Sequence, residues 1–209
     1  HEYDGNIQLL ADFMEQHSIE VVFHLASLFT RNHALHDLDA IIDSNIRLGL
    51  HILEAMKLSK TPFLVNAGTS WQHFGDEYYN PVNLYAATKQ AFEDLVRFYV
   101  EMKSIRCISL HLFDVYGEED ERRKIISELY VNQDPNRIFE MTSGEQIIDL
   151  LHVREIVKAF IHAADLLVQD GNILLDVFGV SCPVRYRLKK IVELLELFRN
   201  VKFNVRWGS

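Results

Sequence analysis

Pro62-Phe63-Leu64-Val65-Asn66-Ala67 is a mostly apolar run that leads into Gly68-Thr69-Ser70. A short run without polar alternation, followed by turn-forming residues, is typical of a strand buried on both faces. Similar runs lie at residues 20–26 and 105–113. Between these runs, apolar residues recur at helical spacing over residues 7–17, 38–58 and 84–103. The pattern therefore predicts strands that alternate with helices.

The second half of the chain continues this alternation. We expect helices at 123–130, 153–168 and 188–198 and strands at 147–151 and 173–178. Buried strands separated by helices predict an α/β protein with a doubly wound, Rossmann-like parallel sheet and a smaller C-terminal substrate-binding lobe. We expect residues 1–117 to be the remainder of a dinucleotide-binding domain. Residues 118–209 would both complete the sheet and bind substrate.

Composition limits the partners. The 209 residues carry a net charge of −9, which argues against nucleic-acid binding. No apolar run reaches the roughly 18 residues of a membrane helix, and no signal peptide is evident. The two cysteines, Cys107 and Cys182, fit buried thiols in a cytoplasmic protein. Ten histidines include the pair His33 and His36, but no carboxylate or cysteine cluster accompanies them at ligand spacing, so no metal site is expected.

The termini read as cuts. The chain has no initiator Met and ends just after a strand-like run. A dinucleotide fold normally opens with a strand, a glycine-rich turn and a helix that hold the pyrophosphate, and no such turn is found here. We therefore expect the chain to begin after that unit.

Tyr85 and Lys89 form a Tyr-x-x-x-Lys spacing at the start of a predicted helix. Residues four apart share a helix face, so the Lys89 ammonium would lie near the Tyr85 phenol and favour its ionised form. Such a tyrosine can give a proton to a carbonyl oxygen or take one from an alcohol. On spacing alone, an exposed Tyr and Lys on a helix is the favoured interpretation.

The hydroxyls of Thr69 and Ser70 follow the strand at 62–67. The carboxyl end of a parallel strand is where such folds bind ligands, so these hydroxyls could polarise a substrate carbonyl. A plain turn role is the alternative.

Taken together, these segments resemble the extended short-chain dehydrogenase/reductases, of the NAD(P)-dependent nucleotide-sugar epimerase/dehydratase type. The resemblance extends over almost the whole chain. It is carried, in order, by Val22-Phe23-His24-Leu25-Ala26-Ser27, Asn45, Thr69-Ser70, Tyr85 with Lys89, residues 110–117 (LHLFDVYG), Gly144-Glu145-Gln146 and residues 149–153 (DLLHV).

Departures from the family pattern narrow the range of reactions that the chain is expected to catalyse. Trp71-Gln72 replaces the acid–base pair of the dehydratases, so dehydration is not expected. His111 occupies a position where the family has an Arg. Ile148 occupies the position of another Arg, which reaches the diphosphate in many relatives. The segments resemble most the 4-ketoreductases of the CDP-abequose and CDP-paratose synthase type.

The resemblance implies reduction of a nucleotide-linked 4-keto-6-deoxy sugar with NADP or NAD, for example in lipopolysaccharide biosynthesis. Rivals are an NAD-dependent 4-epimerase and a non-catalytic relative that senses cofactor or acts as a scaffold. A homodimer through the helices at 38–58 and 84–103 is also implied. The implied catalytic residues are Ser70, Thr69, Tyr85 and Lys89; the cofactor contacts are Leu25, Ala26, Ser27 and Asn45 with Tyr85 and Lys89; the substrate contacts are Asp114, Gln72, Arg122 and Arg123.

Overall fold

The computed structural model describes residues 1–209 except 1–2, 119, 121–123, 133, 135 and 209. The chain forms two compact units. Unit 1 contains residues 1–112 and 158–180, and unit 2 contains residues 113–157 and 181–209.

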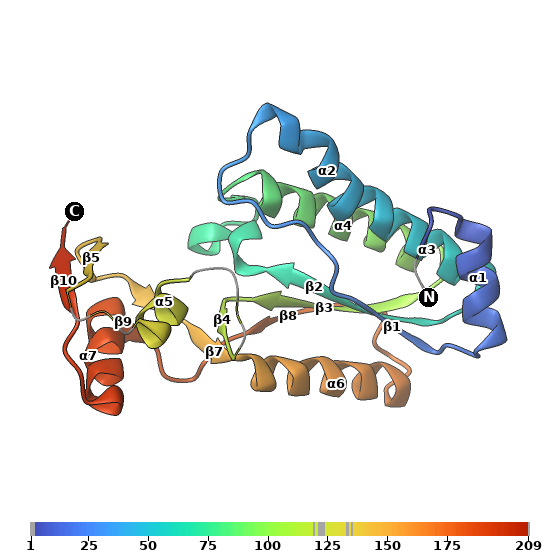
Figure 1. Ribbon diagram of the computed structural model, residues 1–209. Coiled ribbons are helices and arrows are strands. Elements are labelled where there is room, and N and C mark those ends of the chain that lie inside the picture. Colours follow the sequence, from blue (N-terminus) through green and yellow to red (C-terminus); the bar gives the residue numbers. More distant parts are fainter. Residues whose placement is uncertain (1–2, 119, 121–123, 133, 135, 209) are drawn as a thin grey trace. The chain divides into compact units, whose positions relative to one another are not determined.

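Unit 1 is built on a parallel four-stranded sheet (Figure 1). The strands are β1 (Val21–His24), β2 (Phe63–Thr69), β3 (Arg106–Leu112) and β8 (Leu175–Val180), in the order β1-β2-β3-β8. His24 is in register with Asn66, and Thr69 is in register with Leu112. The carboxyl ends of the strands therefore lie along one edge, where α/β sheets bind ligands.

Helices cover both faces of this sheet. One face is covered by α1 (Ile7–Gln16), α3 (Leu48–Ser59) and α4 (Leu84–Glu101), whose buried side chains form one core with those of β2 and β3. The described part of α6 (Val153–Gln169) that belongs to unit 1 lies against the other face, where the Phe160 and Phe23 rings are 6.4 Å apart. Gly49 permits α3 and α4 to approach, because a Cβ there would lie 2.3 Å from the Phe92 ring.

The helix predicted at 38–58 contains a π-helical turn. It follows a short 3₁₀ turn at Leu35–Asp37 and consists of α2 (Leu38–Ile42), the π segment Asp43–Arg47 and α3. π turns often occur at functional sites because the extra residue reorients side chains. Here the turn contains Asn45, which is 1% exposed.

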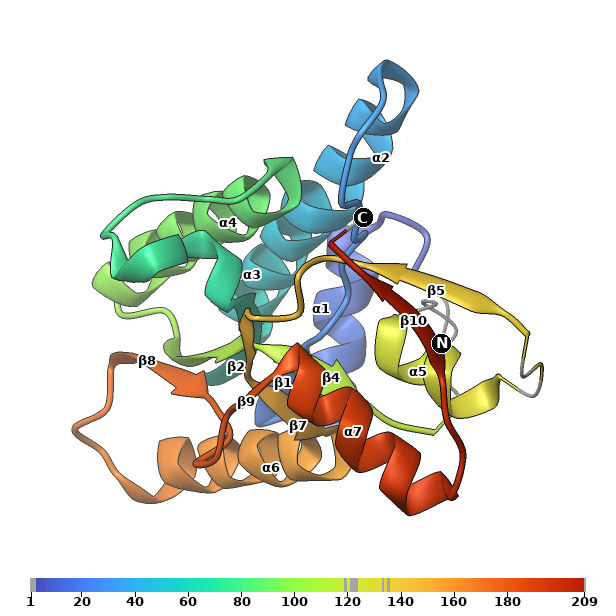
Figure 2. The same ribbon diagram turned by 90° about the vertical axis from the view of Figure 1, so that its left-hand side faces the viewer.

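In its described residues, unit 2 combines short strand pairs with the helices α5 (Ile125–Val131) and α7 (Leu188–Arg199) (Figure 2). Its core includes Leu129, Phe139 and Leu188. The strand pairs are β4 (Asp114–Tyr116) with β7 (Leu150–His152), β5 (Ile138–Met141) with β10 (Asn204–Trp207), and β6 (Ile147–Ile148) with β9 (Tyr186–Arg187).

The predicted fold class, a parallel sheet with helices on both faces, is confirmed. The single strand predicted at 147–151 is wrong, because β6 and β7 are separated at Asp149 and pair with different partners. The predicted helix at 123–130 corresponds to α5, and Arg123 lies outside the described residues.

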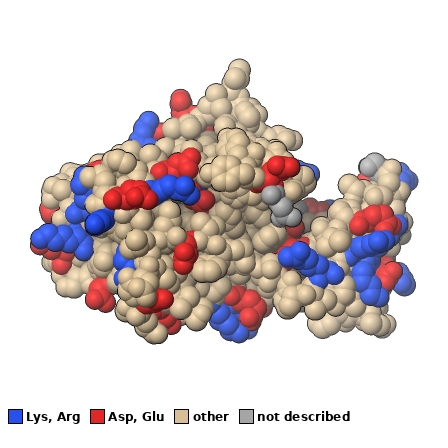
Figure 3. All heavy atoms as spheres, turned by 180° about the vertical axis from the view of Figure 1, so that it is seen from behind, with Lys and Arg blue, Asp and Glu red and all other residues tan. Residues whose placement is uncertain are grey.

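Figure 3 shows Lys and Arg together with Asp and Glu on one face of the molecule. Among the helices that the structure describes, none is long and apolar enough to cross a membrane.

Candidate active site

The turn after β2 presents the two predicted hydroxyl residues differently. Thr69 is 9% exposed, and its hydroxyl accepts a hydrogen bond from the Trp71 amide at 3.4 Å, which caps the 3₁₀ turn Ser70–Gln72. Ser70 is the first residue of that turn and is half-buried. Thr69 therefore shapes the turn, and Ser70 is the better placed of the two to reach a ligand at the strand end.

Gln72 stabilises this turn through hydrogen bonds of its side-chain amide. It is 0% exposed, its Oε1 accepts from the Thr69 amide at 2.8 Å, and its Nε2 donates to Gln90 at 3.2 Å. These bonds join the turn to α4. The predicted substrate contact by Gln72 stays a prediction, since its amide is engaged inside unit 1.

The N-terminus of α4 holds the Tyr-x-x-x-Lys pair. Asn83 caps the helix, because its Oδ1 accepts from the Ala86 amide at 3.0 Å. Its Nδ2 donates to the carbonyls of Thr30 and Arg31 at 3.3 and 3.1 Å. The cap thus ties the start of α4 to the loop that follows β1.

Tyr85 and Lys89 lie one helical turn apart on α4. Tyr85 is half-buried, and Lys89 is 3% exposed. Burial lowers the pKa of Lys89 to about 8, and the Glu93 carboxylate opposes that change. A lysine that is still mostly protonated near neutrality, yet poorly solvated, is suited to stabilising a negative charge brought next to it.

His24, at the end of β1, belongs to the same buried region. It is 2% exposed and its ring lies 4.8 Å from that of Phe92. Burial, and then the charge of Lys89, lower the pKa of His24 to about 4. Its imidazole is therefore neutral at pH 7.

Asn45 links the loop after β1 to α4. Its Oδ1 accepts from the Leu28 amide at 2.7 Å, and its Nδ2 donates to the Leu28 carbonyl at 3.1 Å and the Thr88 hydroxyl at 3.0 Å. The Thr88 hydroxyl donates in turn to the Tyr85 carbonyl at 2.7 Å. The polar atoms of Asn45 are thus engaged in positioning the loop relative to Tyr85.

The predicted cofactor contacts Leu25, Ala26 and Ser27 are exposed on this loop. Phe29, further along it, lies edge-on to Tyr85 with ring centroids 5.0 Å apart and is 48% exposed. An exposed loop at the sheet edge, held by Asn45 and Asn83, fits one side of a dinucleotide site.

Sequence reasoning missed Phe29, Asn83 and Thr88. An Asn directly before an apolar helix start is an N-cap signal, so Asn83 was available from the sequence. No sequence pattern placed Phe29 against Tyr85, or Thr88 against Asn45.

The predicted substrate residues of unit 2 are only partly described. Arg122 and Arg123 lie outside the described residues. Asp114 is at the surface, and its backbone amide donates to the Asp149 carbonyl at 3.0 Å. The pKa of Asp114 is raised, because the partial burial of its carboxyl outweighs the opposing effect of the Lys124 ammonium. Arg185, whose Nε lies 2.9 Å from the Asp149 carboxylate, is a cation in unit 2 that sequence reasoning missed.

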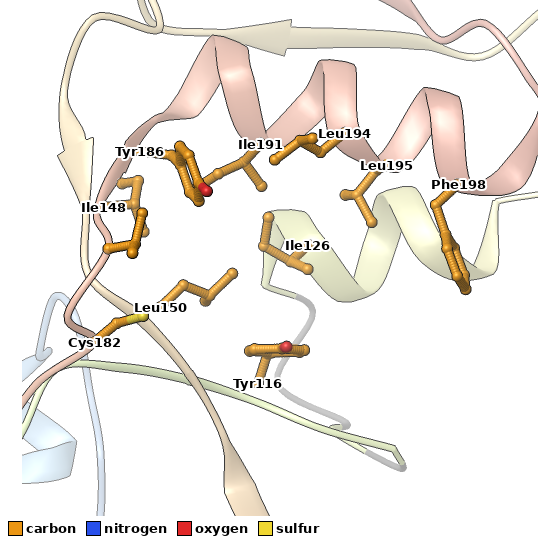
Figure 4. Close-up of a pocket in the computed structure, with 11 residues that line it drawn as sticks. Tyr116, Ile126, Ile148, Leu150, Cys182, Tyr186, Ile191, Leu194, Leu195 and Phe198 are labelled. Carbon is orange, nitrogen blue, oxygen red and sulfur yellow. The ribbon is translucent and has the colours of Figure 1, made fainter. Parts of the chain in front are cut away.

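Unit 2 also contains a cavity of about 380 Å³ that is open to solvent on one side. Its walls are apolar, and side chains of α5 and α7 face one another across it with Tyr116 and Tyr186 (Figure 4). The lining residues are Tyr116, Ile126, Ile148, Leu150, Cys182, Val184, Tyr186, Ile191, Leu194, Leu195 and Phe198. The cavity provides apolar contact area for a ligand group, and it carries none of the predicted catalytic residues.

Residues 5–174 match the sequence model of the NAD dependent epimerase/dehydratase family. The chain belongs to this family. The predicted membership is confirmed, and the predicted cofactor class agrees with the NAD dependence in the family's name.

Curated relatives cover several nucleotide-sugar enzymes. The chain is 27% identical over 193 residues to a CDP-abequose synthase of Salmonella muenchen, an alignment that spans 92% of this chain and 64% of the relative. It is 28% identical over 203 residues to a UDP-glucuronate 4-epimerase of Thermodesulfobacterium geofontis, with 91% and 60% coverage. The chain thus spans less than two thirds of the length of these family members.

Two solved structures with bound NAD share the fold of this chain. MoeE5 in complex with UDP-glucose and NAD superposes with a TM-score of 0.84 at 21% identity, covering 100% of this chain and 71% of that one. UDP-glucose 4-epimerase from Brucella ovis in complex with NAD gives 0.85 at 18% identity, with 100% and 72% coverage. At these identities the likeness establishes the fold.

Proposed function

We propose that this protein reduces a nucleotide-linked 4-keto-6-deoxy sugar with NADPH or NADH. The observation that carries the proposal is the pair Tyr85 and Lys89 on α4, where Lys89 is buried with its pKa lowered to about 8. Family membership supports nicotinamide-dependent chemistry on a nucleotide sugar, and the similarity to CDP-abequose synthases supports ketoreduction.

Each residue has a stated role. Tyr85 gives a proton to the C4 carbonyl oxygen as that oxygen gains negative charge. Lys89 stabilises the phenolate that remains and holds the nicotinamide ribose. Ser70 donates a hydrogen bond to the same carbonyl oxygen, while Thr69 and Gln72 keep the turn in place.

Bound NAD(P)H would supply the hydride for this reduction. The chain's contribution is the surface along the loop after β1. Leu25, Ala26 and Ser27 are exposed there, and Phe29 offers an exposed ring beside Tyr85. Asn45 holds that loop through Leu28, so its effect on cofactor binding is one of positioning.

Unit 2 would bind the rest of the substrate. Asp114, Arg122 and Arg123 remain the proposed polar contacts, and Arg185 is added as a cation for the diphosphate. The apolar cavity would accept a ring or a methyl group by burial of nonpolar area. A role in lipopolysaccharide or other surface-polysaccharide biosynthesis, in the cytoplasm, goes with this substrate class.

The first rival is an NAD-dependent nucleotide-sugar 4-epimerase, favoured by the similarity to a UDP-glucuronate 4-epimerase. It would use the same Tyr85 and Lys89 but return the hydride to the sugar, so it would consume no cofactor. The second rival is a non-catalytic relative that binds cofactor as a sensor or scaffold. The buried, desolvated Lys89 argues against it, because a scaffold gains nothing from a buried ammonium.

The deciding experiment mixes the protein with NADPH and a freshly prepared CDP-4-keto-6-deoxy sugar and follows the loss of NADPH. We expect stoichiometric loss, and a decrease of at least about 100-fold in Tyr85→Phe with cofactor affinity unchanged. Cofactor binding without net loss would favour the epimerase. Absence of cofactor binding, or normal turnover in Tyr85→Phe, would overturn the proposal.

We also propose a homodimer through the helices at 38–58 and 84–103. Large apolar side chains are exposed along them, including Ile42, Leu58 and Phe98, the last 56% exposed. Light scattering should give twice the chain mass for the protein and a monomer for Phe98→Glu, because a charge in the contact would be desolvated. Leu197→Glu, an exposed site on α7, is the control.

A further inference from the structure

Three potential metal ligands meet beside the turn that contains Ser70. His73, Glu93 and His111 come from that turn, from α4 and from β3, and one ligand atom of each lies within 4.8 Å of the other two. The three belong to unit 1. None of them is a predicted catalytic residue, although Glu93 is one helical turn from Lys89 on α4 and acts on its pKa. Sequence spacing gave no sign of the cluster.

His73 is oriented by backbone carbonyls. Its Nδ1 lies 2.7 Å from the Tyr78 carbonyl and 3.3 Å from the Glu77 carbonyl. A carbonyl only accepts, so Nδ1 carries the proton and Nε2 keeps its lone pair in the neutral ring. Metal-binding histidines usually have this arrangement, in which the second nitrogen donates to a carbonyl.

Glu93 and His111 form the buried side of the cluster. The Glu93 Oε1 and His111 Nε2 atoms are 2.7 Å apart, and the two side chains are only 12% and 8% exposed. The His111 ring lies against the Gly68 backbone, because a Cβ at Gly68 would be 2.4 Å from its Cδ2. The ring also stacks on that of His73, with centroids 5.4 Å apart and planes 14° apart.

We propose that His73, Glu93 and His111 form a binding site for a divalent transition-metal ion, with Zn²⁺ as the preferred occupant. The cation would replace the hydrogen between Glu93 Oε1 and His111 Nε2, and a proton would pass to solvent. Two imidazoles and one carboxylate are a common zinc ligand set, with water as the fourth ligand. Water can enter from the His73 side, which is half-buried rather than enclosed.

The geometry requires a modest adjustment. Ligand atoms on a tetrahedral zinc are roughly 3.4 Å apart, given bonds of about 2.0–2.1 Å. Separations here reach at most 4.8 Å, so the longest must close by up to about 1.4 Å, and the 2.7 Å pair must open by about 0.7 Å. Side-chain rotation of His73 supplies the first change. Imidazole ligands favour Zn²⁺, Cu²⁺ and Ni²⁺ over Mg²⁺ and Ca²⁺, which prefer oxygen ligands.

Binding of the metal ion would fix the position of the turn that contains Ser70. The His73 amide donates to the Ser70 carbonyl at 3.3 Å, so a metal on His73 would fasten this turn to α4 and β3. The metal has a positioning role in this proposal and takes no part in proton transfer.

The first test is titration of the metal-stripped protein with Zn²⁺ and Co²⁺. We expect one ion to bind per chain. The visible spectrum of bound Co²⁺ should indicate a low coordination number with nitrogen ligands, and X-ray absorption should show two imidazole ligands. A hundredfold excess of Zn²⁺ over Kd should raise Tm by about 5–10 °C. Hydrogen exchange should slow at residues 70–80.

The variants separate this site from surface binding. His73→Ala and Glu93→Gln should each weaken Zn²⁺ binding at least about 100-fold while the circular dichroism spectrum stays unchanged. His36→Ala is the matched control, since His36 also lies beside a carboxylate but its side chain is 85% exposed. Unchanged affinity in both ligand variants, or a loss in His36→Ala alone, would overturn the proposal.

Discussion

His24 and Lys89 occupy one buried region, and the charge of Lys89 makes protonation of His24 less favourable. Burial and the Lys89 charge hold the pKa of His24 at about 4, against 6.5 for an exposed histidine. The neutral imidazole and the protonated lysine are therefore the pair present at pH 7.

His24 should make the protein sensitive to acid. Its folded pKa lies below its unfolded value, so the unfolded state binds the proton first, and stability present above pH 6.5 is lost as the pH falls toward 4. The loss should be on the order of 2–3 kcal/mol. Urea unfolding at several pH values measures it, and His24→Leu should show a flatter slope across this window. An equal slope in both proteins would refute the assignment.

Lys89→Met should stabilise the protein while it abolishes turnover. At pH 7 the buried ammonium costs free energy, so we expect the variant to be about 1–3 kcal/mol more stable. The folded pKa of about 8 is below the unfolded 10.5, and the wild-type protein therefore regains stability between those values. The gap between the two proteins should narrow from pH 8 to 10, as followed by thermal unfolding. A gap that is constant with pH would show that packing, and not charge, causes it.

The rate of reduction should fall as the pH rises above about 8. Lys89 loses its proton there and no longer stabilises the Tyr85 phenolate. The measurement is the pH profile of kcat/KM under NADPH saturation with EDTA present. Lys89→Arg, if active, should keep its rate to higher pH because a guanidinium stays charged. A shared alkaline limb in the two enzymes would assign it to another group.

Asn45→Ala should lower stability and weaken cofactor binding together. The change removes the bonds to the Leu28 backbone and to the Thr88 hydroxyl, at a cost of about 1–3 kcal/mol. A double-mutant cycle with Thr88→Val isolates the bond between the two side chains. We expect the double variant to be less destabilised than the sum of the single variants. Strict additivity would mean that the two residues act independently.

The sequence predicted the sheet because its strands are buried. Residues 62–67 and 105–113 are apolar on both faces, and this property can be read from the sequence without knowing how the side chains pack. Tyr85 and Lys89 were recognisable because their spacing is local. The order and the burial of these segments required no knowledge of distant contacts.

Other features depend on contacts that local patterns do not encode. The π turn at Asp43–Arg47 keeps helical spacing nearly intact, so periodicity predicted one uninterrupted helix. β5 and β10 pair across a long stretch of sequence. His111 meets Glu93 and His73 only because the register of β3 places it beside Gly68.

The exposed position of β1 has a practical consequence. Within the described residues β1 pairs with β2 alone, and Phe23 on it is 43% exposed. A strand with one open edge can pair with a further strand, and an exposed apolar side chain adds contact area to that pairing. We therefore expect a short peptide that is complementary to residues 21–24 to add to the sheet at β1.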